Sequence, residues 1–343
     1  MADSTFGLSI ESLELEQSVN LAELLPKWST PKVLKGLVNH WPVVEADKNG
    51  QLNDYLRQFG SDNVFNVVVA GADAKGRLFY NQDMSGFNFG RRQGSIKDVL
   101  AQLSQVSQLS QSGQTNQEHQ PTIYLGSTSV EKCLPGFLAE QNLPLNELQP
   151  LISAWLGNQT RIAAHFDAVD NIACVAGGKR RFTLFAPEQL KNLYVGPSDF
   201  TPAGQAISLV DFHHPDYEKY PRFKIAEQNA YVAELEAGDA LFIPAMWWHH
   251  VEALEDINLL INYWWRSTPR FMGEPMDAFR HALLSVKSLP VAQRKAWQQV
   301  FDHYVFNDAD LEHVSEDKRG EQGTIDEDNA RRMRSHLLQK LNR

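Results

Sequence analysis

Short apolar and β-branched runs recur through the middle of the chain, between residues 121 and 268. Gly, Pro and Asp turn signals such as Gly177-Gly178 and Gly238-Asp239 separate these runs. The expected strands are Thr122–Leu125, Ile172–Ala176, Arg181–Phe185, Ala230–Leu235, Ala240–Ile243 and Ile257–Trp265. Many short strands with this punctuation are typical of a barrel or jelly roll. We therefore predict a mainly β core over residues 121–268.

Mixed helical and strand-like patterns precede this core, in residues 1–120. The sequence predicts short helices over Ala22–Trp28 and Ser95–Leu103, and strands over Pro31–Val38 and Val64–Ala70. Residues 102–120 are rich in Gln and Ser, which predicts a solvated helix end and a loop with little to bury. We expect this N-terminal part to flank the barrel.

Two further segments differ from the strand-rich core. Tyr194–Asn229 is long, aromatic and Pro-rich, which predicts a structured insertion near the mouth of a site. After Pro275 the pattern becomes helical, so residues 269–343 are expected to form a C-terminal helical region. The helices predicted there are Met276–Lys287, Val291–Phe306 and Glu327–Leu341.

Composition narrows the class of protein. Apolar residues make up 43% and charged residues 22% of the 343, as in an ordinary globular protein. No apolar run approaches the roughly 20 residues of a membrane span, and the N-terminus is acidic where a signal peptide would be basic. We expect a cytoplasmic protein with no membrane partner. The net charge of −10 also disfavours nucleic-acid binding, which depends on Lys and Arg neutralising phosphates.

Candidate metal ligands stand out in two segments. In the strand-like run that leads into His165-Phe166-Asp167, residues two apart point to the same face, so His165 and Asp167 would converge. Trp247-Trp248-His249-His250 offers a third ligand, and we favour His249 because only one of two neighbours faces inward. Two imidazoles and a carboxylate are the ligand set of non-haem Fe(II) oxygenases. A His-x-Asp triplet also arises by chance, and a His among aromatics is often a hydrogen-bonded core residue.

The surrounding motifs resemble the cupin-like JmjC family of 2-oxoglutarate oxygenases, which includes protein asparaginyl hydroxylases. His165-Phe166-Asp167, Gly178 to Phe185, Gly238 to Pro244 and Trp247-Trp248-His249 follow one another in the family's order. The resemblance covers roughly residues 30–270. It implies a double-stranded β-helix, that is a jelly roll, flanked by helices, with Fe(II) held by His165, Asp167 and His249. It also suggests a homodimer through the C-terminal helices.

The resemblance assigns further residues to the 2-oxoglutarate pocket. The matching positions are Tyr124, Asn171, Arg180, Asn262 and Trp264. Arg180 stands where the asparaginyl hydroxylases of this family have a lysine. Arginine and lysine are not interchangeable as carboxylate ligands. Lys179 competes with Arg180 if the strand register shifts by one residue. Ile162 replaces a threonine, which removes a hydroxyl group from the pocket.

The implied function is hydroxylation of a protein or peptide side chain, or of a small molecule, with Fe(II), 2-oxoglutarate and O₂. An alternative is a cupin-like protein that binds a small acid or sugar with a metal but without turnover, motivated by Ile162 and Arg180. A role on chromatin is disfavoured by the acidic charge. Asn262 and Tyr124 also have a purely structural interpretation, as core residues that satisfy backbone groups.

Overall fold

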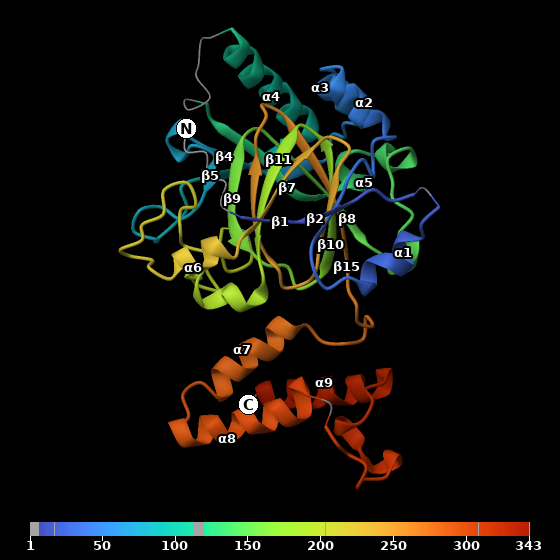
Figure 1. The fold of residues 1–343 in the computed structure, drawn as a ribbon, viewed down its shortest axis with the longest axis vertical. Coiled ribbons are helices and arrows are strands. Elements are labelled where there is room, and N and C mark those ends of the chain that lie inside the picture. Colours follow the sequence, from blue (N-terminus) through green and yellow to red (C-terminus); the bar gives the residue numbers. More distant parts are fainter. Residues whose placement is uncertain (1–6, 17, 113–119, 203, 308, 343) are drawn as a thin grey trace. The chain divides into compact units, whose positions relative to one another are not determined.

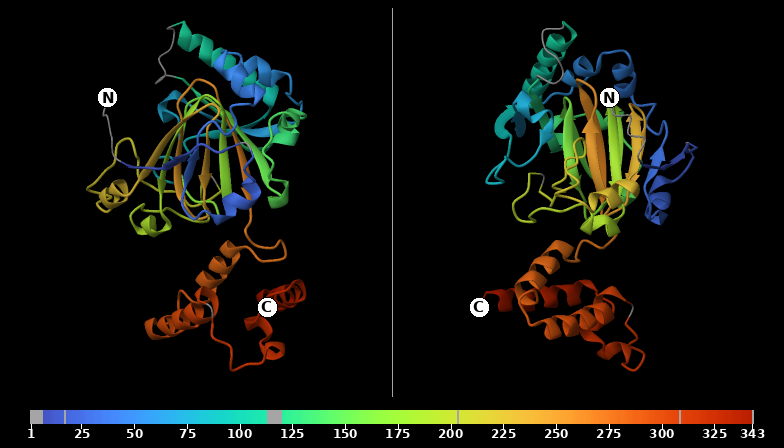
Figure 2. Two further views of the ribbon diagram at one scale, coloured as in Figure 1. Left: turned by 45° about the vertical axis from the view of Figure 1, so that its right-hand side comes forward. Right: turned by 60° about the vertical axis from the view of Figure 1, so that its left-hand side comes forward.

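A computed structural model describes residues 7–342 of the chain apart from 17, 113–119, 203 and 308. The chain divides into two compact units, Met1–Ser267 and Thr268–Arg343. The larger unit contains two β-sheets with helices outside them, as Figures 1 and 2 show. The mainly β fold with flanking helices that the sequence predicts is confirmed.

Each sheet combines central strands from the predicted core with edge strands from the N-terminal part. The six-stranded sheet runs in the order β1 (Leu8–Ser9), β12 (Tyr231–Glu236), β11 (Lys179–Phe185), β14 (Trp248–Ala253), β9 (Thr160–His165) and β5 (Arg77–Leu78). The nine-stranded sheet runs β2 (Glu11–Leu13), β3 (Lys32–Leu34), β13 (Ala240–Ile243), β10 (Asp170–Gly177), β15 (Asn258–Trp265), β8 (Leu151–Gly157), β7 (Thr122–Ser129), β4 (Val64–Ala70) and β6 (Gly90–Ser95). Residues 1–120 therefore extend both sheets outward.

Strand β10, in the nine-stranded sheet, is buried on both faces. In β10, Ala173 and Val175 pack with Phe182 and Val251 of the other sheet, whereas Ile172 and Cys174 belong to the cluster under the helices. This double burial explains why the strand reads as a continuous apolar run rather than an alternating one. The helices on its outer side are α1 (Leu21–Leu24), α2 (Pro42–Lys48), α3 (Leu52–Arg57), α4 (Ile96–Gln111) and α5 (Val130–Cys133).

Helix α4 is longer than the sequence predicts. Residues 102–111, expected as part of a loop, continue the helix, and residues 113–119 lie outside the described part of the chain. Leu103 and Val106 extend the buried stripe that starts at Ile96, so tertiary packing holds the Gln/Ser-rich turns in the helix. Ser95 and Asp98 form a capping box at the start of α4: the Asp98 N–H donates to Ser95 Oγ, and the Ser95 N–H donates to Asp98 Oδ2.

The predicted strand over Pro31–Val38 is wrong after its first half, because β3 ends at Leu34. The chain turns at Gly36, which has a φ of +66°. Asp239 holds this turn by accepting hydrogen bonds from the Gly36 N–H and from Lys35 Nζ, at 3.0 and 2.7 Å. A polar contact between segments about 200 residues apart therefore ends the strand.

Gly178, between β10 and β11, occupies a position where a side chain would not fit. Its φ is +73°, and a Cβ there would lie 2.5 Å from Asn258 Oδ1 and 2.7 Å from the Ile257 carbonyl oxygen. We expect Gly178→Ala to lower the free energy of unfolding by about 2 kcal/mol or more, measured by urea denaturation. Gly136→Ala is the matched control, because its φ is +86° but its Cβ would meet nothing within 4 Å. Equal losses for both variants would contradict the steric part of the prediction.

The outer face of the six-stranded sheet is covered by the insertion that follows β11. Within the segment 194–229, α6 (Phe223–Gln228) and Phe212 pack against Phe185 and Trp248 of the sheet. The ring centroids of Phe185 and Phe212 lie 5.6 Å apart, edge to face. The insertion is structured over its described residues.

The C-terminal unit is helical. Its main helices are α7 (Pro275–Ser285), α8 (Val291–Phe301) and α9 (Glu327–Leu341). A turn of π-helix over Asp302–Phe306 continues α8 to the end that the sequence predicts. In the described part of the chain, no helix is long and apolar enough to cross a lipid bilayer.

Candidate metal centre

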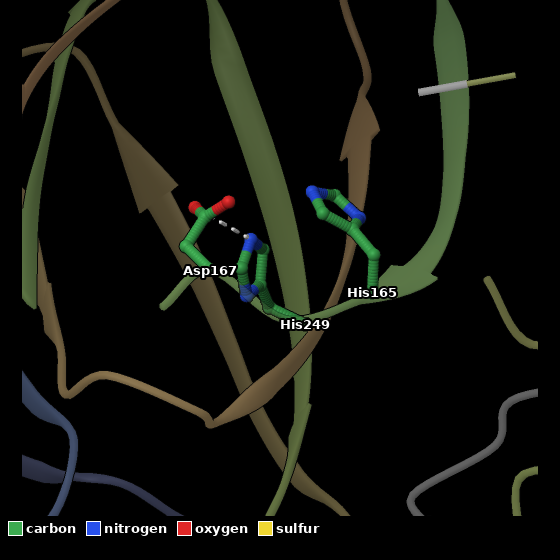
Figure 3. A group of neighbouring side chains, drawn as sticks. All are labelled: His165, Asp167 and His249. Atoms are coloured by element: carbon green, nitrogen blue, oxygen red, sulfur yellow. Dashed lines mark ion pairs between the residues drawn. The ribbon is translucent and has the colours of Figure 1, made fainter. Parts of the chain in front are cut away.

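His165, Asp167 and His249 converge at one point between the two sheets. Each offers one ligand atom, and these atoms all lie within 4.8 Å of one another. His249 Nε2 is 3.7 Å from Asp167 Oδ2, and the two imidazole centroids are 4.4 Å apart. Figure 3 shows the three side chains turned toward a common space. This spacing suits a single ion held by two nitrogens and one oxygen.

A β-bulge aims His165 into the site. His249 pairs with His165 and Val251 with Ile162, so β9 advances three residues while β14 advances two. In a regular strand Ile162 and His165, three residues apart, would point to opposite faces. The extra residue in β9 brings both side chains to the same cavity.

Asp167 lies beyond the end of β9, so strand alternation alone does not place it, contrary to the reasoning from the sequence. The Met246 N–H donates a hydrogen bond of 2.8 Å to the Asp167 carbonyl oxygen. Met246 itself has a φ of +68°, a conformation that costs a non-glycine residue free energy. This contact ties the Asp167 segment to the segment leading into His249.

Both imidazoles are oriented by backbone carbonyl groups. His165 Nδ1 lies 2.9 Å from the Ala163 oxygen, and His249 Nδ1 lies 3.0 Å from the Trp247 oxygen. A ring nitrogen facing a carbonyl must carry the proton, which leaves Nε2 of each ring free as a ligand. Burial, and then the neighbouring His165, lowers the pKa of His249 to about 4. His249 is therefore neutral at pH 7, as a metal ligand requires.

His250 faces the opposite side of the sheet. Its ring lies 4.7 Å from that of Phe212, in the insertion on the outer face. Of the two neighbouring histidines, the structure brings His249 to Asp167 and His165, and it leaves His250 outside the group.

The cavity around the three ligands is also lined by Tyr124, Asn171, Arg180, Asn262 and Trp264, the residues assigned to the cofactor from the sequence. Arg180 is 2% exposed and reaches inward, whereas Lys179 pairs with Glu234 at 3.2 Å on the outer side. Ile162 lines the cavity with a purely apolar side chain. The register thus selects Arg180 over Lys179.

Trp155 of β8 is a lining residue that the sequence analysis missed. Its ring lies between those of Tyr124 and Trp264, at centroid distances of 6.1 and 5.7 Å. The signal available was its place in a strand-like apolar run, but that run does not reveal which side chains face a cavity.

Several polar atoms of this cavity are buried without a partner. They are Arg180 Nε, Trp155 Nε1, Trp264 Nε1 and Asn262 Oδ1. Arg180 Nη2 donates to the Trp155 carbonyl oxygen at 3.3 Å, while burial lowers the pKa of Arg180 to about 10. The guanidinium is therefore charged at pH 7, and over the described part of the chain no carboxylate forms an ion pair with it. Unpaired buried donors are costly, and a bound anion with acceptor oxygens would satisfy them.

A barrel of two sheets with an inward imidazole–imidazole–carboxylate group defines a metal-binding cupin architecture. A family model described as a cupin-like domain matches residues 19–271. The chain belongs to this cupin-like domain family, as its motifs predict.

Curated relatives match shorter stretches. The tRNA wybutosine-synthesizing protein 5 of Gallus gallus is 35% identical over 115 residues, 34% of this chain and 33% of the relative. Lysine-specific demethylase JMJ31 of Arabidopsis thaliana is 30% identical over 130 residues, 37% and 23% of the two chains. Lysine-specific demethylase 8 of Xenopus tropicalis is 24% identical over 241 residues, 68% and 48%. The chain spans about a third of the length of the first of these relatives.

Proposed function

We propose that this protein is an oxygenase that uses Fe(II), 2-oxoglutarate and O₂ to hydroxylate its substrate. The observation that supports it best is one cavity that joins the metal-ligand group to an unpaired, charged Arg180. Two imidazoles and one carboxylate leave coordination positions open, which this chemistry requires. Membership in the cupin-like family supports the same reading.

Different residues of the cavity bind the metal and the 2-oxoglutarate. His165 and His249 each offer an Nε2 atom, and Asp167 offers a carboxylate oxygen, to one metal ion. Bound iron supplies the oxidising chemistry, coupled to conversion of 2-oxoglutarate into succinate and CO₂. Arg180, with the Tyr124 hydroxyl, holds the distal carboxylate of 2-oxoglutarate.

The two asparagines and Trp264 line the same pocket. Asn262 donates a hydrogen bond of 2.8 Å to Asn171 Oδ1, so each fixes the other's orientation. Asn262 Oδ1 remains as an acceptor, and the Trp264 indole N–H as a donor. Apolar Ile243 and Leu260 exclude water around these groups.

Turnover and binding test the proposal separately. Purified protein supplied with Fe(II) and O₂ should convert 2-oxoglutarate to succinate, and omission of iron should stop it. Calorimetric titration with 2-oxoglutarate in the presence of Mn(II), without O₂, should show stoichiometric binding. Protein that holds metal but does not bind 2-oxoglutarate would instead support the alternative, a cupin-like binding protein without oxygenase turnover.

The substrate we propose is a protein side chain or a small molecule. The segments 71–92 and 194–229, where we expect specificity, contact each other: Tyr80 donates a 2.6 Å hydrogen bond to the Phe200 carbonyl, and the Phe87 and Phe200 rings stack at 4.9 Å. One relative is named for wybutosine synthesis in tRNA and others for lysine demethylation. The net charge of −10 favours substrates other than nucleic acids, and an electrophoretic shift assay with tRNA tests this.

We also propose that the protein is located in the cytoplasm.

We further propose a homodimer through the C-terminal helices. Large apolar side chains of α7 and of the turn after α8 are exposed, among them Leu284 at 75% and Phe306 at 74%. Light scattering should give twice the chain mass of 38.8 kDa, and the double variant Leu284→Glu, Phe306→Glu should give the single mass. Leu190→Glu, at an exposed leucine of the larger unit, is the control. A monomeric wild type would contradict the proposal.

A further inference from the structure

A second hollow lies on the outer face of the six-stranded sheet. Its volume is about 650 Å³, and it is lined by parts of β5, β9 and β14 and by the segment that contains Asp211. Because side chains alternate along β9, Arg161 faces this hollow while Ile162 faces the metal cavity. Arg161 is four residues before His165, roughly 13 Å along the strand. The hollow is therefore separate from the metal centre.

Two arginines converge in this hollow on a single carboxylate. Arg77 Nη1 lies 3.4 Å from Asp211 Oδ2, and Arg161 Nη1 lies 3.6 Å from Asp211 Oδ1. Both distances are longer than a good charge-assisted hydrogen bond, so neither guanidinium is paired bidentately. Strand pairing holds the two residues together, since Arg77 is opposite Arg161 in the β5–β9 ladder. Two positive charges thus share one negative charge in a partly buried place.

Two residues that line the hollow also carry buried donor atoms without hydrogen-bond partners among the described residues. Arg77 Nη2 is buried and unpaired, although the Arg77 guanidinium lies 3.7 Å above the Phe79 ring. Gln120, only 8% exposed, lines the hollow, and its Nε2 is also buried and unpaired. Burial lowers the pKa of Arg77, Asp211 opposes this shift, and the nearby charge of Arg161 adds to it. These donors lack an acceptor.

Three carboxylates line the hollow, and one of them, Asp73, is exposed to solvent. Of the other two, Glu252 Oε1 lies 2.5 Å from His213 Nε2, and Asp211 lies between the two arginines. Within the described residues, the metal centre is the only group of three or more histidine, cysteine or acidic side chains close enough to share a metal ion. The chemistry of the hollow therefore favours an anion over a cation.

We propose that this hollow is a binding site for an oxyanion, a phosphate or carboxylate group, held by Arg77 and Arg161 with Gln120 as a further donor. The planar guanidinium fork matches the oxygen spacing of both groups. The site is independent of iron and 2-oxoglutarate, so it stands whether or not the oxygenase proposal holds.

Calorimetric titration with inorganic phosphate and, separately, with citrate tests the site and distinguishes the two sources of oxyanion. The protein is treated with EDTA, and His165→Ala protein is titrated alongside, so that binding at the metal centre does not contribute. We expect saturable binding of at least one anion by both proteins. Arg77→Gln and Arg161→Gln should each weaken that binding at least about tenfold. Arg57→Gln, which is remote from the hollow, should leave it unchanged.

Asp211→Asn should have the opposite effect on the affinity for the anion. Removal of the competing carboxylate should tighten anion binding several-fold, whereas a purely structural salt-bridge cluster predicts no gain. The Asp211→Asn variant tests the anion site even if an arginine variant does not fold, which circular dichroism would reveal. Absence of binding by wild-type protein at millimolar phosphate and citrate would overturn the proposal. So would binding that is unaffected by Arg77→Gln and Arg161→Gln, or weakened by Asp211→Asn.

Discussion

Asp167→Ala protein is expected to retain little bound iron and to form succinate from 2-oxoglutarate more than roughly 100-fold more slowly than wild type. Loss of a residue that merely supports a metal ligand costs about 10- to 100-fold, and loss of the only anionic ligand should exceed this. Asp167 is the single carboxylate among the three converging groups. Elemental analysis of anaerobically reconstituted protein and a succinate assay measure the two effects.

The controls separate ligand loss from unfolding. Asp62→Ala removes an exposed carboxylate paired only with Lys97, and it should leave iron content and turnover near the wild-type values. His249→Ala should behave like Asp167→Ala, whereas His250→Gln should keep its iron because His250 faces Phe212. Normal turnover by Asp167→Ala protein, or iron loss in His250→Gln but not in His249→Ala, would contradict the ligand assignment.

Local sequence patterns predict much of this fold because the strands are buried in regular ways. Val64–Ala70 is a β-branched run bounded by a glycine, and β4 has the predicted ends. His165 and Asp167 converge as predicted, but the predicted reason is wrong, because the strand ends before Asp167. The predicted helix ends before α4 does, because the Gln and Ser content of the last turns indicates a loop. The helix nevertheless continues, because Leu103 and Val106 are buried on its apolar stripe.

What the sequence does not predict depends on contacts between distant segments. The bulge in β9 that turns His165 inward is a property of its pairing with β14, about 85 residues later. Trp155 lines the cavity only because β8 lies next to β15. Arg77 and Arg161 come together through the β5–β9 ladder, and neither belongs to a motif. Such long-range pairings carry little local signal.

Arg180→Gln is expected to raise the KM for 2-oxoglutarate by about 100-fold or more. Arg180 is 2% exposed and charged, and no carboxylate of the described residues pairs with it. Its loss would therefore leave the distal carboxylate of 2-oxoglutarate buried and unpaired. Breaking a buried ion pair costs roughly 3–5 kcal/mol, and each 1.4 kcal/mol corresponds to about tenfold in affinity. Succinate formation at varied 2-oxoglutarate gives the KM, and calorimetry without O₂ gives the dissociation constant.

Arg180→Lys distinguishes charge from geometry. Lysine keeps the positive charge but loses the planar fork, so we expect an intermediate KM, between those of wild type and Arg180→Gln. Arg181→Gln is the matched control, because Arg181 points to the outer face and pairs with Glu234 there. If Arg180→Gln and Arg181→Gln have the same KM while both proteins remain folded, the distal carboxylate is held elsewhere. The unpaired guanidinium beside the metal ligands would then need another anion, which the same calorimetric titration with succinate or oxaloacetate would identify.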